Sequence, residues 1–316
     1  MKKTVYLIIA LLGVLIFSIN VQAEETKIVC TNSVLADYTS NLITENVTIT
    51  HIMPGGICPS HFDLTPSHAS QIIEADIIIS LGWEPWLTNI SDKLIDIDQQ
   101  QIKCHGLGEW SLPSNTIKFV EKIRDGLAEI LPEKNASIEK NAEEYIDELN
   151  EKSEYLQNMI TSMNYEKRKV IVMNWQKEFV EWLGLTVAAS YGPPEGLSTQ
   201  DKLNITTTAD DDEITVIIDN LQSGTEFGEQ TAKETGKIHV VFTNFPGAIE
   251  NVDTYLEMIE YNTAELIKGI ANYDYLQGNI NLVDCSDFEL QRNTAALFAL
   301  ISIILALIFY IMYRRR

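Results

Sequence analysis

Two short segments of the chain carry sulfur and imidazole side chains close together. In the segment 53–67 Cys58 stands three residues before His61, and further on Cys104 is followed directly by His105. Thiolate and imidazole groups are ligands that Zn²⁺ and other borderline metals prefer. Cys58, His61 and His105 are therefore candidate metal ligands, with His61 the foremost. Two alternatives stay open: His61 is an exposed loop residue, and the cysteines form a disulfide or are inert thiols.

A second set of candidates lies in the other half of the chain and consists of amides, aromatic rings and one carboxylate. Such groups suit a polar organic ligand or a chelated metal as well as a bare ion. Asn and Gln in loops also serve turns, which is the alternative for them. The candidates for contact with a ligand in a cleft are Trp175, Gln176, Glu195, Gln222 and Asn244.

Motifs and charge exclude two classes of protein. The sequence lacks Gly-x-Ser-x-Gly, a P-loop, His-Glu-x-x-His and a glycine-rich dinucleotide turn, so we do not expect an enzyme. The 316 residues include 23 Lys and Arg against 45 Asp and Glu, for a formal net charge of −22. Nucleic-acid binding needs a basic surface, and this charge argues against it. An acidic surface instead attracts cations non-specifically.

Strands that alternate with helices must position the candidates in the first half of the chain. Such alternation is typical of βαβ units and a parallel sheet. Thr65-Pro66 is a typical N-cap followed by Pro at the first helical position, and His68 falls on the helix that begins there, where we expect it at the surface. The predicted strands are 27–30, 47–53, 76–81 and 101–104, and the predicted helices are 33–44 and 66–75.

The second half repeats the alternation after two amphipathic helices. Apolar residues three and four positions apart predict these helices over 114–131 and from 135 for roughly 28 residues, or ~42 Å. The second helix is long enough to be a rigid link between two lobes, each with a parallel four-stranded sheet flanked by helices. Ligands of such α/β sheets bind beyond the carboxyl ends of the strands. The remaining predicted strands are 169–173, 185–190, 214–219 and 239–243, and the helices are 176–183, 198–209, 228–235 and 253–270.

The two ends of the chain predict its location. Lys2-Lys3, an apolar run and Ala23 are typical of a secretory signal peptide, with an uncleaved anchor as the alternative. Residues 294–313 carry no charge, which predicts a transmembrane helix, and the arginines at 314–316 predict a cytoplasmic end. We therefore expect an extracytoplasmic domain at the cell surface, anchored by a C-terminal helix. The predicted parts are a signal peptide (1–23), an N-terminal lobe (24–134), a linking helix (135–164), a C-terminal lobe (165–280), a tether (281–293), a transmembrane helix (294–313) and a tail (314–316).

Several stretches of the chain share residues with one known family. The loop 53–67 resembles a Pro-Gly-x-Asp-Pro-His-x-Tyr-Glu-x-Thr-Pro-Ser loop that follows the second strand in the cluster A-I solute-binding proteins of zinc and manganese ABC transporters. The resemblance covers about Lys27 to Gly269 and implies the fold and a role in transport. The other matching stretches are Ala75-Asp76, Gly82–Leu87, Glu139–Ile146, Gly184-Leu185 and Asp253–Leu256.

The resemblance does not extend to the family's metal ligands. That family usually offers three histidines and one carboxylate from four loops. Aligned without gaps, the four positions hold Ser60, Gly108, Met173 and Asn244 in this chain, and His61 lies one place after Ser60. The resemblance therefore implies the transport role without the usual metal site.

We expect an extracytoplasmic solute-binding protein that captures a divalent metal ion such as Zn²⁺ or Mn²⁺, or a metal complex, for the permease and ATPase subunits of an ABC importer. No organic cofactor and no nucleic-acid partner is expected. If the protein ligates the metal itself, His61→Ala should weaken binding at least tenfold, or ~1.4 kcal/mol. Two alternatives remain: the same fold binding another small polar solute, and a surface adhesin or interaction protein without metal binding.

Overall fold

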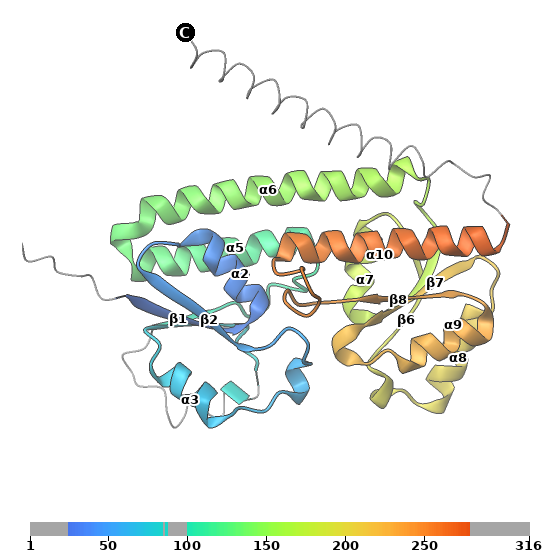
Figure 1. Ribbon diagram of the computed structural model, residues 1–316, viewed down its shortest axis with the longest axis horizontal. Helices are drawn as coiled ribbons and strands as arrows, with labels where there is room; N and C mark the ends of the chain where they lie inside the picture. The colour runs from blue at the N-terminus through green and yellow to red at the C-terminus, as the bar shows by residue number, and fades with distance from the viewer. Residues whose placement is uncertain (1–24, 85, 88–99, 279–316) are drawn as a thin grey trace, which may run out of the picture. The chain divides into compact units, whose positions relative to one another are not determined.

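The β-branched runs of the sequence form two separate parallel sheets, one in each lobe (Figure 1). The computed structural model describes residues 25–84, 86–87 and 100–278. The strand order is β2-β1-β3-β4 in the N-terminal lobe and β6-β5-β7-β8 in the C-terminal lobe. The strands are β1 (Thr26–Asn32), β2 (Val47–Met53), β3 (Ile77–Ser80), β4 (Gln100–Lys103), β5 (Lys169–Met173), β6 (Thr186–Tyr191), β7 (Ile214–Asn220) and β8 (Ile238–Phe242).

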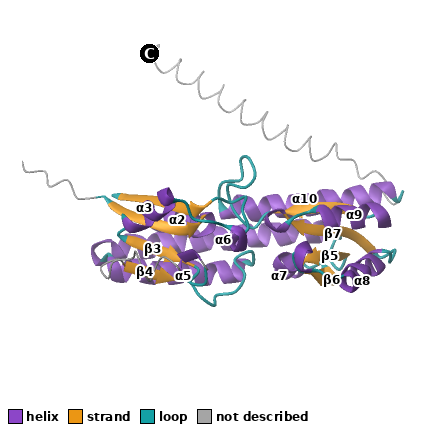
Figure 2. Ribbon diagram, turned by 90° about the horizontal axis from the view of Figure 1, so that it is seen from below, coloured by secondary structure: helices purple, strands orange, loops and turns teal. Residues whose placement is uncertain are grey.

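All eight predicted strands are confirmed, and their ends differ from the prediction by at most two residues. The prediction works because the inner strands are apolar runs that must be covered on both faces: all seven residues of β7 and all four of β3 are buried. Figure 2 shows helices packed against both sheets. The helices are α2 (Ser33–Leu42), α3 (Pro66–Ile73), α5 (Pro113–Ile130), α6 (Asn135–Ser162), α7 (Lys177–Trp182), α8 (Thr199–Ala209), α9 (Glu226–Thr235) and α10 (Tyr255–Leu276).

Helix α3 begins as the sequence predicts, and its start gives His68 a structural role. Thr65 Oγ1 accepts a hydrogen bond from the His68 N–H at 3.3 Å, and His68 Nδ1 accepts one from the Thr65 N–H at 3.2 Å. The imidazole also packs on Phe62, with ring centroids 5.3 Å apart. His68 is thus a half-buried capping residue.

The long helix predicted from residue 135 is confirmed as α6, which has 28 residues. Near its beginning it packs against α2 and α5 of the N-terminal lobe, with Ile138 and Tyr145 buried there. Near its end the Gln157 amide donates to Trp182 O of the C-terminal lobe at 2.8 Å. Helix α6 therefore makes contacts with both lobes.

Helix α10 makes a second connection. The Tyr255 N–H donates to Asp37 Oδ2 of α2 at 3.0 Å, and the Tyr255 hydroxyl donates to Ser111 O at 3.2 Å. Burial raises the pKa of Asp37 from its ordinary 3.8 to about 6. The helix ends at Leu276, six residues later than predicted, and Gly278, with a left-handed φ of 68°, follows its end.

The residues up to Ile270 form one compact unit that contains both lobes, and the end of α10 belongs to a second unit. The predicted signal peptide, tether, transmembrane segment and tail lie outside the described residues. Among the residues that are described, no helix has both the length and the apolarity needed to cross a membrane.

Candidate functional site

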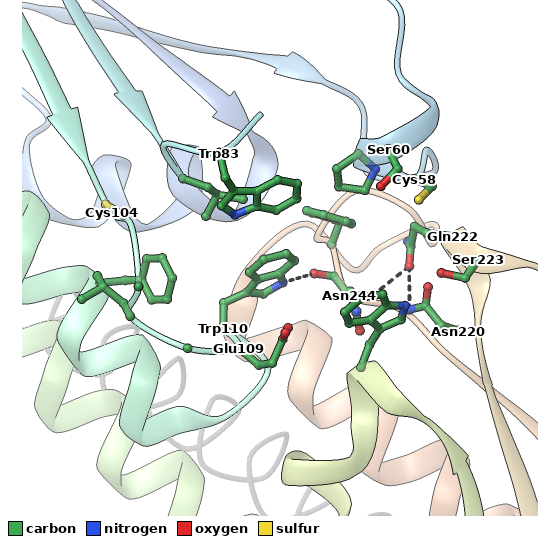
Figure 3. A pocket seen from close by; sticks show the side chains of 18 residues that line it. Cys58, Ser60, Trp83, Cys104, Glu109, Trp110, Asn220, Gln222, Ser223 and Asn244 are labelled. Atoms are coloured by element: carbon green, nitrogen blue, oxygen red, sulfur yellow. Dashed lines mark hydrogen bonds between the residues drawn. The ribbon is translucent and has the colours of Figure 1, made fainter. Parts of the chain in front are cut away.

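The carboxyl ends of both sheets open onto a cavity between the lobes. It encloses about 410 Å³ and is lined by the loops that follow β2, β3, β4, β5, β7 and β8 (Figure 3). The loop after β6, which carries Glu195, does not contribute to the lining. Of the residues singled out in the sequence, Cys58, Trp175, Gln222 and Asn244 line this cavity.

Three indoles from both lobes line the cavity. Trp83 follows β3 and Trp175 follows β5, and they keep 43% and 38% of their surfaces exposed. Trp110, after β4, is buried, and its Nε1 donates to Asn244 O of the other lobe at 2.7 Å. Figure 3 shows the rings of Trp83 and Trp110 both reaching into the space in front of Asn244. Large apolar faces exposed in a concavity are typical of a ligand-binding surface.

A tight turn holds Trp83 in place. The carboxylate of the buried Glu84 accepts three backbone N–H groups, from Leu81 at 2.8 Å, Gly82 at 2.8 Å and Trp83 at 3.0 Å. Gly82 has a φ of +82°, a conformation that glycine adopts without strain. The exposed indole is therefore presented by an ordered backbone, which lowers the entropy cost of binding against it.

Gln222 ties the loops of both lobes together with its side-chain amide. Its Nε2 donates to Gly55 O of the N-terminal lobe at 2.7 Å and to Thr243 Oγ1 at 2.9 Å. Its Oε1 accepts the Asn220 amide and the Asn244 N–H, both at 3.1 Å. Both donors and both lone pairs are used, so Gln222 builds the cavity wall and has no group left over for a ligand.

Behind this wall lies Gln176. It is 1% exposed, and its Nε2 donates to Asn244 Oδ1 at 3.1 Å. Within the described residues, its own Oε1 has no hydrogen-bond partner. Gln176 thus supports Asn244 from outside the cavity lining, and Asn244 itself lines the cavity.

Glu109 brings a carboxylate to the cavity. Burial and the nearby charge of Glu178 raise the pKa of Glu109 above its ordinary value. The Asn115 side-chain amide donates to the Glu109 carbonyl at 3.1 Å and fixes the loop after β4. A half-buried carboxylate beside indole faces gives the site a negative character.

The thiols are poorly prepared to bind a metal ion. The three cysteines in the described part of the chain, Cys30, Cys58 and Cys104, are free. Burial raises the pKa of Cys30 and of Cys104 to about 12, so both are protonated at neutral pH. Because the thiolate is the metal-binding form, Cys104 is not activated for ligation. Cys58 lines the cavity from the loop after β2.

The other candidates lie at the rim or outside the cavity. His61 Nε2 is 3.9 Å from Glu195 Oε1, across the two lobes, and both side chains are mostly exposed. His105 is exposed and does not line the cavity. The structure therefore brings His61 and Glu195 together, but it does not join them with Cys58 or His105. Within the described residues no three His, Cys, Asp or Glu side chains form a cluster able to hold a metal ion.

Three of the four positions where the resemblance would put metal ligands line the same cavity, namely Ser60, Gly108 and Asn244; Met173 is fully buried. The backbone conformation disfavours a side chain, and hence a ligand, at Gly108. It has a φ of +88°, and a Cβ there would lie 2.5 Å from Asn115 Nδ2. The cavity thus lies where the resemblance would put a metal site, and its lining differs from the set of ligands that the resemblance implies.

Sequence reasoning missed Trp83, Trp110 and Glu109 as site residues. Each follows the carboxyl end of a predicted strand, and Trp83 stands between Gly82 and Glu84 in a stretch that resembles the family. For Trp83 the available signal was an indole shortly after a strand end and beside a glycine, whereas Glu109 and Trp110 lie further along their loop. What a sequence pattern cannot tell is which loop side chains turn inward.

The sequence of the chain matches one protein family and several characterised relatives. Residues 28–269 match the ZnuA family, described as "Zinc-uptake complex component A periplasmic". The chain is 24% identical to the manganese-binding lipoprotein MntA of Halalkalibacterium halodurans, over 78% of this chain and 89% of that protein. It is 20% identical to the manganese ABC transporter substrate-binding lipoprotein PsaA of Streptococcus pneumoniae serotype 4, over 78% and 90%.

Solved structures share the fold. The Mn-bound periplasmic metal binding protein from Candidatus Liberibacter asiaticus superposes with a TM-score of 0.67 at 19% identity, covering 78% of this chain and 99% of that one. A crystal structure of ZnuA gives a TM-score of 0.66 at 17% identity, with the same coverage. The family match over residues 28–269 spans both lobes and the linking helix.

Proposed function

Because the chain belongs to the ZnuA family of periplasmic zinc-uptake components, we propose that it is the solute-binding component of an ABC importer that takes up metal. It would capture its cargo outside the cell and deliver it to a permease driven by an ATPase subunit. The observation that carries this proposal is the cavity between the lobes, since it is lined by three of the positions at which the family's ligands are expected. No feature of the chain supports an enzyme.

The cargo we propose is a divalent metal, Zn²⁺ or Mn²⁺, either as the ion or as a complex. A bare ion would need protein ligands, for which His61, Cys58 and His105 are the candidates from the sequence. A complex brings its own ligands, and it needs the kind of surface that Trp175, Gln222 and Asn244 help to build. The absence of a cluster of metal-binding side chains among the described residues favours the complex.

The location we propose is the outer face of the cell membrane. Relatives such as PsaA are named as lipoproteins of ABC transporters. For this chain we propose instead an N-terminal signal peptide over 1–23 and a C-terminal anchor over 294–313, because these segments have the required apolar character and flanking charges. The anchor would keep the acidic domain beside the permease.

Transport of metal by cells tests this function. In cells that carry the gene, its deletion should lower the uptake of radiolabelled Zn²⁺ or Mn²⁺ from metal-poor medium, and restoring the gene should recover it. Unchanged uptake of both metals in the deletion strain would contradict the proposed function. This readout does not depend on how the protein holds its cargo.

A further inference from the structure

We propose that the cleft binds a cation that carries an organic shell, held by the indole faces of Trp83 and Trp175 and by the carboxylate of Glu109, with no bond between a metal and a protein atom. This inference rests on the proposed function and specifies the form of its cargo. It follows from the size of the cavity, from the groups that remain available in it, and from its charge.

The cavity is too large for a bare ion. Its volume is about 410 Å³. Direct ligation of Zn²⁺ needs protein atoms about 2 Å from the ion, whereas pockets for small organic ligands span about 300–1,000 Å³. Nor do the described residues offer three metal-binding side chains close together. An ion with its own shell of ligands fills this space, and a bare ion does not.

Several polar groups of the wall are already engaged. Gln222 uses all its donors and acceptors, Asn244 Oδ1 accepts from Gln176, and the Trp110 N–H donates to Asn244 O. These groups cannot replace the hydration shell of an ion without breaking the wall. The wall also exposes large apolar surfaces, above all those of Trp83 and Trp175.

The charge of the lining selects a cation. Among the described residues that line the cavity, Glu109 is the carboxylate, and the lining includes no Lys, Arg or His. The face of an indole attracts a cation through its quadrupole, and this attraction strengthens when water is excluded. A carboxylate together with indoles therefore discriminates against neutral and anionic solutes. The chain's net charge of −22 draws cations toward the same surface.

A cation with an organic shell has two sources, a metal complex and an organic ammonium ion. Titration calorimetry of the purified protein distinguishes them with four kinds of probe. The first is tris(ethylenediamine)cobalt(III), a metal complex that does not exchange its ligands. The second is choline, and the third is 3,3-dimethyl-1-butanol, which is its neutral carbon analogue. The fourth is Zn²⁺ or Mn²⁺ added as the chloride.

The variants Trp83→Ala and Glu109→Gln test two of the three groups that hold the cation. Each should weaken binding of the cations that carry an organic shell, the cobalt complex and choline, by about fivefold or more, since a cation–π contact contributes about 1 kcal/mol. Trp83→Phe should recover part of the loss. The matched controls are Tyr155→Ala and Glu151→Gln, which alter an exposed ring and an exposed carboxylate of α6 away from the cavity. Unchanged melting temperatures show that the variants are folded.

Binding of the cobalt complex or of choline at least tenfold tighter than the neutral alcohol, with loss in both cavity variants, supports the inference. If choline binds and the cobalt complex does not, the inference that the cleft binds a cation with an organic shell is supported. The same result contradicts the proposed function, because the cargo is then not a metal. If Zn²⁺ or Mn²⁺ binds more tightly than both the cobalt complex and choline, and Trp83→Ala has no effect, the inference is overturned. The proposed function in metal uptake is not affected by that result. Binding of no probe also overturns it.

Discussion

Single residues decide what the cleft can hold, and Gln222 is the clearest case. Its amide joins Gly55 of the N-terminal lobe to Thr243 and Asn244 of the C-terminal lobe. A carboxylate of the same shape could accept hydrogen bonds but not donate them. The wall of the cavity therefore depends on an amide at this position, which the sequence predicts only as a ligand contact.

Gln222→Glu should lower the free energy of unfolding by about 2 kcal/mol, because two donated hydrogen bonds are lost and the Gly55 carbonyl faces a negative charge. Urea denaturation followed by circular dichroism measures this change. The control is Gln200→Glu on the exposed face of α8, which should cost much less. Equal effects of the two substitutions would show that Gln222 does not hold the wall together.

Asp37 gives the molecule a pH dependence at the start of α10. Its pKa is raised by burial to about 6, so the folded protein holds this proton more tightly than the unfolded chain. The stabilisation is fully present below the ordinary value of 3.8 and is lost as the pH rises through 6. Asp37→Asn keeps an oxygen for the Tyr255 N–H and removes the charge.

At pH 8 the free energy of unfolding of the Asp37→Asn variant should therefore exceed that of wild type by about 1–3 kcal/mol. Near pH 4 the difference should vanish. Denaturation series at the two pH values give the comparison. A variant that is less stable than wild type at pH 8 would mean that the ionised carboxylate itself stabilises the helix start.

At the scale of elements, the long helix α6 connects the two lobes. Ile146 lies in the middle of it and packs against the core. Ile146→Pro should cost ~3 kcal/mol or more beyond the loss of the side chain, because it removes a backbone hydrogen bond and clashes with the preceding turn. Ile146→Ala is the matched control for lost packing. Similar unfolding free energies for the two variants would argue against a continuous, stabilising helix.

The elements were predictable from the sequence, and the cavity only in outline. β-Branched runs such as Ile77–Ile79 have to be strands, and the three-and-four spacing of Ile138, Ala142 and Tyr145 has to be a helix. The loops after the strands were rightly expected to meet. The inward turn of Trp83 was not foreseeable, because it depends on three N–H groups that converge on Glu84.

At the scale of the whole molecule, the chain combines an acidic two-lobed domain with apolar ends that lie outside the described residues. The proposed anchor predicts that deletion of residues 293–316 releases the domain. After cell fractionation the shortened protein should be recovered in the soluble extracytoplasmic fraction, with an unchanged melting temperature. Retention in the membrane fraction after removal of the signal peptide would disprove the anchor.

The central claim is that the cargo lies between the lobes and brings its own ligands. Anomalous X-ray diffraction from crystals of the protein purified from its native cells, with its cargo bound, tests this claim most directly. The account predicts a metal inside the cavity beside Trp83 and Glu109, with no protein nitrogen, oxygen or sulfur atom within a bonding distance of about 2.3 Å. A metal bonded to His61, Cys58 or any other side chain, or found outside the cavity, would contradict it.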